Sequence, residues 1–272
     1  MKLRKFLPLL AIPFLLIGCK KDVTYPFKLG LGGPDVPVGQ YSSQILEYFG
    51  IDEASLNERG YISYGSNVKE VTSQVKKGLV HAGMIYATDA FSANLKVVDH
   101  ATSEMCDEVI YPVAILKRTT QQAAASAFLS YMRSTVAMEK YEAVGFTGLN
   151  KLENYEEAPA GERTLTVFAA ASMTESLNAV IASYKSVASN IKVIANYESS
   201  GTLLKQLNNG AYCDIFLSAA QKQMNTLDTA EQLVEGTRVN ILQNQVVLSV
   251  PDQNPSKINS FDDLISKLNS LA

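Results

Sequence analysis

Residues 164–204, TLTVFAAASMTESLNAVIASYKSVASNIKVIANYESSGTLL, predict a βαβ unit. Residues 165–170 form an apolar run short enough for a buried parallel strand, and residues 191–197 supply the second strand. Ser172 stands where a helix N-cap belongs, with Glu175 three residues later, which is the spacing of a capping box. The SSGT sequence that follows the second strand is expected to begin another helix.

The two serine-bearing turns of this unit, at Ser172 and Ser200, are expected to face one crevice. The carboxyl ends of parallel strands meet at the same edge of an open α/β sheet, which is where such sheets bind ligands. The first turn of a helix carries backbone N–H groups without partners and the positive end of the helix dipole. Hydroxyls and N–H groups in this arrangement predict a binding site for a small anion.

The composition fits an α/β protein of one or two globular lobes. The chain has 272 residues, of which 47% are apolar, and this is enough to bury a core. Its formal net charge of −3 argues against a nucleic-acid partner, because such a partner needs a basic surface. A small anion is not excluded, since backbone N–H groups and hydroxyls bind anions without a net positive charge.

The N-terminus has the features of a bacterial lipoprotein signal. MKLRK is basic, and residues 6–17 are an apolar run that is shorter than the roughly 20 residues of a membrane-spanning helix. The run leads into IGC, which resembles a lipobox and implies that Cys19 becomes a lipid-modified N-terminus anchored to a membrane. Residues 1–18 are then the signal peptide and residues 19–26 a short tether. An ordinary cleavable signal with an incidental cysteine is the alternative.

Strands and helices alternate on both sides of the βαβ unit. Strands are expected at residues 27–31, 61–64, 80–86, 96–98, 108–116 and 213–218, with paired strands at residues 239–242 and 246–250. Helices are expected at residues 40–49, 68–77, 121–133, 135–144, 220–232 and 261–271. Pro112 predicts an edge position or a bend in its strand. Residues 149–163 are acidic, contain Pro and Gly, lack apolar periodicity and are the expected linker.

Cysteines and histidines give little support for a metal or catalytic site. Cys106 and Cys213 are expected to be separate thiols, because one lies in a loop and the other begins a core strand. His81 and His100 have no metal-ligand partner at useful spacing. A serine hydrolase lacks support too, since neither a GxSxG nor an SxxK motif nor a suitable histidine accompanies the serines. The chain is therefore not expected to be an enzyme.

Four segments together resemble one family. VPVGQYSSQIL, GMIYATDA, LTVFAAASMTESL and YESSGTLLKQLNNGAYCDIFLSAAQKQM are similar to the molybdate-binding protein of bacterial ABC transporters. The resemblance covers the chain after residue 26 apart from the linker. It implies a two-lobe α/β fold of the type II periplasmic-binding-protein kind, with the ligand in the cleft between the lobes. Lobe A would comprise residues 27–103 and 251–272, and lobe B residues 104–250.

The resemblance also implies the ligand contacts. Ser172 and Ser200 would each give the oxyanion a hydroxyl, and the phenol of Tyr86 would complete the shell. Val38 and Val68 would donate backbone N–H groups at helix starts. Molybdenum would be bound only as its oxyanion, and no cofactor is expected. A shell made only of donors suits a fully deprotonated tetrahedral oxyanion (molybdate, tungstate or sulfate), whereas a protonated phosphate needs an acceptor.

Five positions depart from the family pattern. Ala220 and Gly33 replace aspartates, and Lys69 replaces an arginine, at positions expected to support the shell without contacting the ligand. Val38 replaces an alanine, and its added bulk would narrow the pocket. Glu198 stands beside the serines where a small residue is usual, and it is expected to face solvent.

The order of the segments differs from that of the family. In the family, the AAAS segment stands at the mature N-terminus, and the part matching residues 27–146 comes last. The chain is therefore expected to be a circular permutant in which residues 149–163 join the family's usual ends. A misassembled gene is the alternative and predicts a broken strand at the cut, but residues 27–31 look like a complete strand.

These expectations define a function. The chain is predicted to be an extracytoplasmic lipoprotein that captures molybdate or tungstate and delivers it to an ABC transporter permease. Its expected partners are the oxyanion, the permease and, through the lipid, the membrane; nucleic acid is not expected, and the protein is expected to be a monomer. The alternatives are a binding protein for another tetrahedral oxyanion such as sulfate, or a permuted remnant that no longer serves transport.

Overall fold

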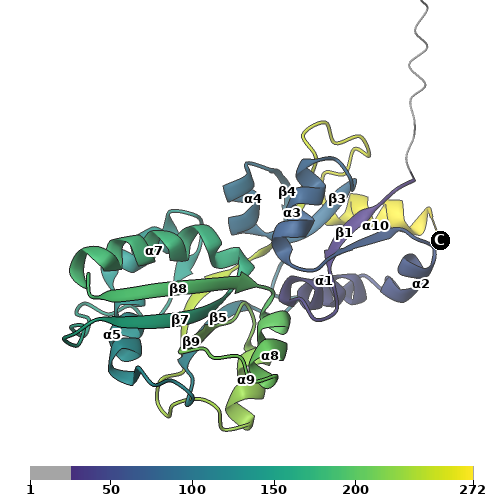
Figure 1. The fold of residues 1–272 in the computed structure, drawn as a ribbon. Coiled ribbons are helices and arrows are strands. Elements are labelled where there is room, and N and C mark those ends of the chain that lie inside the picture. Colours follow the sequence, from purple (N-terminus) through teal and green to yellow (C-terminus); the bar gives the residue numbers. More distant parts are fainter. Residues whose placement is uncertain (1–25, 272) are drawn as a thin grey trace, which may run out of the picture.

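The computed structural model describes residues 26–271, which form two α/β lobes, each built on one β-sheet (Figure 1). The expected signal peptide and the expected lipidation of Cys19 lie outside the described residues. Among residues 26–271, no helix combines the length and the hydropathy that a membrane crossing requires. The predicted two-lobe α/β fold is confirmed.

The first lobe contains a mixed five-stranded sheet in the order β2-β1-β3-β11-β4. β1 lies between β2 and β3 in parallel, whereas β11 runs antiparallel to both β3 and β4. The strands are β1 (Leu29–Gly32), β2 (Ile62–Gly65), β3 (Ala82–Tyr86), β4 (Lys96–His100) and β11 (Val246–Val250). The helices of this lobe are α1 (Pro37–Tyr48), α2 (Glu53–Glu58), α3 (Val68–Lys76), α4 (Ala87–Ala93) and α10 (Phe261–Asn269).

The second lobe contains a mixed six-stranded sheet in the order β6-β10-β5-β9-β7-β8. Its strands are β5 (Val109–Ile115), β6 (Thr147–Gly148), β7 (Arg163–Ala170), β8 (Ile191–Glu198), β9 (Ile215–Leu217) and β10 (Val239–Asn244). Its helices are α5 (Gln122–Met132), α6 (Thr135–Glu142), the 3₁₀ turn η1 (Ala171–Met173), α7 (Thr174–Val187), α8 (Ser200–Asn208) and α9 (Gln221–Thr229).

The βαβ unit of residues 164–204 forms as predicted. β7 pairs in parallel with β8 over its whole length, and Ala170 lies opposite Glu198 at the end of the ladder. Leu165 and Val167 are fully buried in the main core, whereas Phe168 points to the other face and packs in a second core with residues of α8 and α9. Because both strands end at the same level, the turns that follow them lie at one edge of the sheet.

The chain crosses from β10 directly into β11, with only Gln245 between the two strands. The prediction that these strands pair with each other is wrong, because β10 belongs to the second sheet and β11 to the first. A two-residue hairpin turn needs positive φ angles, and neither Gln243 nor Asn244 has one. The segment 246–250, which the sequence assigned to lobe B, therefore lies in the sheet of the first lobe.

Two local expectations need correction. Ser172 does not cap α7: β7 runs into the turn η1, and the N-cap of α7 is Met173, without a side-chain hydrogen bond. Pro112 does not lie at a sheet edge, since β5 is flanked by β10 and β9. The ladder between β5 and β10 shifts register between Asn240 and Leu242, next to Pro112, and this irregularity accommodates a residue that has no N–H to donate.

The cysteines Cys106 and Cys213 are both free, as predicted. Burial raises the pKa of the Cys213 thiol to about 12, so the thiol stays protonated. Among the described residues, no group of three or more His, Cys, Asp or Glu is placed to hold a metal ion.

Candidate functional site

The structure brings all five predicted ligand contacts together in one small cavity between the lobes. The cavity spans about 200 Å³, including space open to solvent, and is lined from both sides. The first lobe contributes Val38, Val68 and Tyr86, and the second lobe contributes Ser172 and Ser200. The remaining lining residues are small or apolar: Val36, Pro37, Ala170, Ala171, Ser199 and Ala219.

Three helices begin at this cavity. Val38 lies in the first turn of α1, and Val68 and Ser200 are the first residues of α3 and α8. Backbone N–H groups in a first turn have no acceptor within their own helix. The side chain of Asn67 caps α3 by accepting from the N–H of Glu70, which leaves the N–H of Val68 free of this cap. The positive ends of three helix dipoles therefore converge on the cavity and favour an anion.

The hydroxyls of Ser172 and Ser200 are held from behind. Ser172 Oγ lies 2.8 Å from the hydroxyl of Tyr111, which comes from β5. Ser200 Oγ accepts a hydrogen bond from the backbone N–H of Ala219 at 3.0 Å. Both serines are buried, so their hydroxyls are positioned by protein contacts and not by solvent.

Tyr86 ends β3 and immediately precedes α4. Its side chain is 1% exposed, and its hydroxyl has no hydrogen-bond partner among residues 26–271. Burial raises the pKa of this phenol well above its ordinary value, so the hydroxyl remains protonated and can donate. A buried polar atom without a partner is uncommon in folded proteins, and this one belongs to a residue that lines the cavity.

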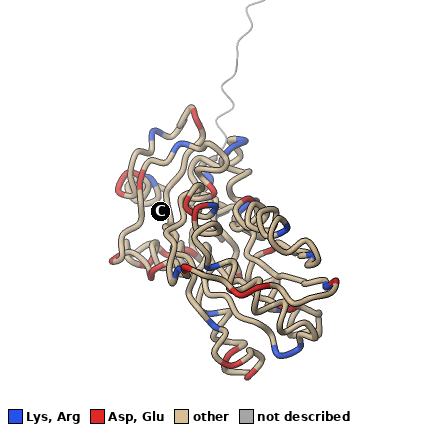
Figure 2. Tube along the Cα trace, turned by 90° about the vertical axis from the view of Figure 1, so that its left-hand side faces the viewer, with Lys and Arg blue, Asp and Glu red and all other residues tan. Residues whose placement is uncertain are grey.

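The lining of the cavity contains no carboxylate. Glu198, the last residue of β8, is half-buried and lies outside the lining. Lys, Arg, Asp and Glu are scattered over both lobes without a basic stripe (Figure 2). The cavity can thus offer several hydrogen-bond donors to an anion without placing a negative side chain against it.

The sequence model of the bacterial extracellular solute-binding protein family matches residues 20–147 and 165–272. The chain belongs to this family. Its members are solute-binding proteins and not enzymes, which agrees with the prediction from the sequence. The two matched blocks leave out the whole of the predicted linker at residues 149–163.

Two relatives of this solute-binding protein carry the name molybdate-binding protein ModA. The protein from Haemophilus influenzae is 39% identical over 103 residues, which cover 38% of this chain and 40% of the relative. The protein from Escherichia coli is 33% identical over 105 residues, covering 39% of this chain and 40% of the relative. Each of these matches spans less than half of the relative's length.

A solved structure shares the fold over nearly the whole chain. The phosphate-binding protein of a phosphate ABC transporter from Streptococcus pneumoniae aligns with a TM-score of 0.54, covering 90% of this chain and 96% of the other. The sequences are only 12% identical in this alignment. This likeness therefore concerns the fold and carries nothing about the ligand.

Lys69 bridges the lobes beside the cavity. Its Nζ lies 2.6 Å from Glu175 Oε2 on α7 of the second lobe and 3.2 Å from Asp89 Oδ1 on α4 of the first. Asp89 is buried, and burial raises the pKa of its carboxyl to about 6, against the opposing effect of Lys69. Lysine in place of the family's arginine at position 69 therefore still provides a cation that contacts both lobes.

A second interlobe contact lies where α8 faces the start of α1 (Figure 1). Lys205 Nζ of the second lobe lies 2.6 Å from Asp35 Oδ2 of the first lobe, at the surface. A Cβ atom at Gly201 would overlap the backbone carbonyl of Asp35, so the backbones approach closely only because residue 201 is glycine. The lobes are therefore closed over the cavity.

Of the other departures from the family pattern, Gly33 and Ala220 lie outside the lining, whereas Val38 belongs to it. Gly33 donates its N–H to the carbonyl of Gly65 and so ties β1 to the end of β2. Ala220 is the N-cap of α9 and supplies no side-chain hydrogen bond there, whereas an aspartate at such a position accepts from the first turn. The Val38 side chain is fully buried against the core.

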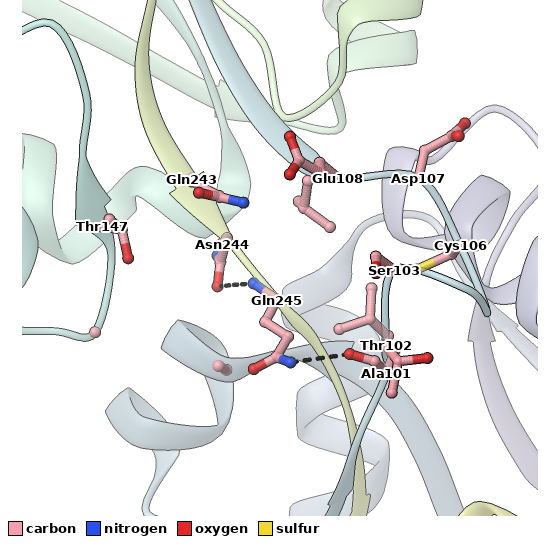
Figure 3. Close-up of a pocket in the computed structure, with 14 residues that line it drawn as sticks. Ala101, Thr102, Ser103, Cys106, Asp107, Glu108, Thr147, Gln243, Asn244 and Gln245 are labelled. Carbon is pink, nitrogen blue, oxygen red and sulfur yellow. Dashed lines mark hydrogen bonds between the residues drawn. The ribbon is translucent and has the colours of Figure 1, made fainter.

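A larger cavity of about 850 Å³, open to solvent, lies beside the segments that cross between the lobes. Its lining includes Thr102, Glu108, Thr147 and Gln245, together with Asp107 (Figure 3). The carboxylates of Asp107 and Glu108 repel an anion, and no helix of eight or more residues begins in its lining. The smaller cavity is the better candidate site because its donors converge.

The sequence did not reveal the residues that hold the ligand contacts in place. Tyr111 lies within an apolar strand, where the pattern shows a core residue and gives no sign of its hydroxyl contact with Ser172. Glu175 was expected to serve a capping box but pairs with Lys69. Contacts of this kind join residues distant in sequence, so periodicity and spacing do not report them.

The first prediction concerns the buried carboxylate of Asp89. Its folded-state pKa is raised from 3.8 to about 6, so the folded chain holds this proton more tightly than the unfolded chain, and stability is lost as pH rises from about 4 to about 6. We expect Asp89→Asn to remove this decrease in the free energy of unfolding, which is about 3 kcal/mol at most. Urea unfolding at several pH values measures it, with the exposed Asp262→Asn as control. A wild-type-to-variant difference that is flat across this window would contradict the expectation.

The second prediction concerns closure at Gly201. Gly201→Ala should stabilise α8 itself by about 0.5–1 kcal/mol while holding the lobes apart at Asp35. Small-angle X-ray scattering should therefore show a larger radius of gyration than for the wild type, without loss of thermal stability. Gly33→Ala is the matched control, since its nearest contact would be an ordinary 3.6 Å to the Gly65 carbonyl. Equal scattering from all three proteins would show that Gly201 does not limit closure.

Proposed function

We propose that the protein is the extracytoplasmic binding component of an ABC transporter and that it captures molybdate, or tungstate, in the cavity between its lobes. One observation carries this proposal. The hydroxyls of Ser172, Ser200 and Tyr86 and the first-turn N–H groups of Val38 and Val68 meet in one closed cavity whose lining has no carboxylate. This set of groups offers donors and a positive potential but no charged acceptor.

The chemistry of these donors favours a fully deprotonated tetrahedral oxyanion. Each oxygen of such an anion accepts hydrogen bonds, and hydrogen bonds to a charged group are about twice as strong as neutral ones. Water is largely excluded by the closed lobes, which strengthens each contact further. Two relatives named molybdate-binding protein ModA support molybdate as the ligand.

Capture and delivery define the proposed cellular role. The loaded protein would present its closed lobes to a permease and release the oxyanion when the lobes separate, which is the hinge motion of such binding proteins. Cys19 would carry a lipid that keeps the protein at the membrane surface. The protein would act as a monomer, because both halves of the proposed site come from one chain.

The third prediction tests the ligand. We expect calorimetric titration to show tight binding of molybdate and tungstate, and Ser172→Ala to weaken it by about ten- to a hundredfold, as expected for loss of one hydrogen bond to a charged ligand. Ser183→Ala is the matched control, since this serine of α7 accepts from Tyr131 at 2.9 Å and lies outside the lining.

The alternatives give different results, either in this titration or in a test of whether a permease accepts the loaded protein. Tighter binding of sulfate than of molybdate would mean that the cavity is an oxyanion site but that its ligand is sulfate. Normal molybdate binding by a protein that a permease does not accept would favour a remnant without a transport role. Failure of molybdate and tungstate to bind would contradict the proposed ligand.

We propose further that the chain is a circular permutant of its family. The family model matches in two blocks, and the segment between them contains the predicted linker at residues 149–163. Residues near the two ends of the described chain touch one turn: Lys28 donates to the carbonyl of Gly60, and Arg59 donates to the carbonyl of Leu271 at 3.1 Å. Segments so close together can be joined without rearranging the fold.

The fourth prediction reorders the chain. A variant that begins at residue 163, runs to residue 271 and continues through a short Gly/Ser linker into residues 27–148 should fold and bind molybdate within about threefold of the original, because both sheets and the cavity lining are kept and only the contacts of residues 149–162 are lost. Circular dichroism and calorimetry measure the two properties. A reordered chain that does not fold would contradict the proposed permutation, whatever ligand the original chain binds.

A further inference from the structure

The ammonium group of Lys69 lies between two carboxylates, one from each lobe. Its Nζ is 3.2 Å from Asp89 Oδ1 of α4 in the first lobe and 2.6 Å from Glu175 Oε2 of α7 in the second lobe. The side chain of Lys69 is 29% exposed and that of Glu175 is 48% exposed, whereas the Asp89 side chain is fully buried. One cation therefore makes an intralobe contact and an interlobe contact at the same time.

These three charged residues lie in the first turns of α3, α4 and α7, beside the cavity but outside its lining. Each of them is within one helical turn, along the chain, of a proposed ligand contact: Lys69 follows Val68, Asp89 follows Tyr86 and Glu175 follows Ser172. A displacement of any of these helix starts therefore moves a charged group and a ligand contact together.

The two contacts of Lys69 respond differently when the lobes separate. The contact with Asp89 lies within the first lobe, where α3 packs against α4, so a rigid-body motion of the lobes leaves it intact. The contact with Glu175 crosses the interface, so the hinge motion that opens the lobes separates these two groups. The Lys69–Glu175 pair therefore stabilises the closed form alone, whereas the Lys69–Asp89 pair is common to both forms.

Asp89 also keeps Lys69 ordered for its second partner. The Asp89 carboxylate is buried and has no hydrogen-bond partner besides this ammonium group within the described part of the chain. A buried charge without a partner is strongly destabilising, so Asp89 holds the ammonium group in place. Because Lys69 is already ordered, its contact with Glu175 forms without much of the side-chain entropy loss that weakens most surface ion pairs.

The other interlobe ion pair lacks these features. Lys205 Nζ also lies 2.6 Å from its partner, Asp35 Oδ2, but the two side chains are 67% and 69% exposed. Ion pairs at this exposure are screened by water and salt and contribute little free energy. Of these two pairs, the one made by Lys69 is therefore expected to matter for binding.

We infer that Lys69 is a positioning residue whose contact with Glu175 holds the lobes closed over the ligand and thereby slows release of the ligand. The inference rests on the proposed function. In the closed form, the ammonium group fixes the starts of α3 and α7 relative to each other, so that donors from both lobes stay within reach of one anion. Release requires the lobes to separate, and separation breaks this contact. Loss of the contact should therefore act mainly on the dissociation rate constant.

Glu175→Gln is the decisive variant, because it removes the interlobe contact and keeps the contact between Lys69 and Asp89. Calorimetry measures the affinity for molybdate, and a chase of bound radioactive molybdate with excess unlabelled molybdate measures its release. We expect affinity to fall about three- to tenfold, through faster release, while thermal unfolding of the ligand-free protein is nearly unchanged. Removal of a negative charge near the cavity would by itself favour an anion, so general electrostatics predicts the opposite sign.

A double-mutant cycle with Lys69→Met isolates the contact. Effects of the two separate charges on the anion add, whereas the direct contact does not, so Glu175→Gln should no longer weaken binding when residue 69 is methionine. Lys69→Arg keeps a cation between the carboxylates and should retain affinity and release within about twofold. If Lys69→Met does not fold because Asp89 loses its partner, the whole cycle is run in an Asp89→Asn background.

Asp35→Asn is the matched control. It also removes the carboxylate of an interlobe ion pair with a 2.6 Å contact, but one that is exposed to solvent. Its affinity for molybdate and its release of molybdate should stay within about twofold of the wild type.

The outcomes separate this inference from the proposed function. If Glu175→Gln binds molybdate at least as tightly as the wild type and releases it no faster, the inference is wrong and the proposed function stands. Equal weakening by Glu175→Gln with lysine and with methionine at position 69 would also overturn the inference. If the wild type binds neither molybdate nor tungstate, the proposed function fails, and the inference fails with it.

Discussion

Unpaired hydrogen-bond donors at the interlobe cavity are the constraint on which the rest of the structure depends. The N–H groups of Val38, Val68 and Ser200 lie in the first turns of α1, α3 and α8, where a helix provides no acceptor of its own, and the hydroxyl of Tyr86 is buried without a partner among the described residues. Each lobe supplies only part of this set, because β3 ends in the first lobe and β7 and β8 end in the second. The site exists only where the lobes meet.

The contacts that close the lobes also shape the electrostatics of the site. Lys69 reaches Glu175 across the interface while holding the buried Asp89 of its own lobe, so a fixed cation stands near the start of α3. Gln245 also has two roles. It is the one residue between β10 of the second sheet and β11 of the first, and its backbone N–H donates to Asn244 Oδ1 and so orients that side chain.

Much of the fold and the meeting of two serine-bearing turns could be predicted from the residue pattern, whereas Val38, Val68 and Tyr86 were named only through the family resemblance; all five residues line the cavity. Buried parallel strands such as β7 are recognisable as short apolar runs, and the SSGT sequence, in which Ser199 caps α8, marks the start of a helix. The crossing from β10 to β11 was mistaken for a hairpin, because polar residues between two apolar runs also suit a turn. Ser172 was mistaken for a cap because its actual partner, Tyr111, is 61 positions away.

Anomalous X-ray diffraction from crystals grown with molybdate, recorded at the molybdenum edge, tests the central claim most directly. The predicted result is one molybdenum peak in the cavity between the lobes, surrounded by oxygens within hydrogen-bond distance of Ser172, Ser200, Tyr86 and the N–H groups of Val38 and Val68. Absence of a peak there, or a peak only in the larger cavity beside Gln245, would contradict it.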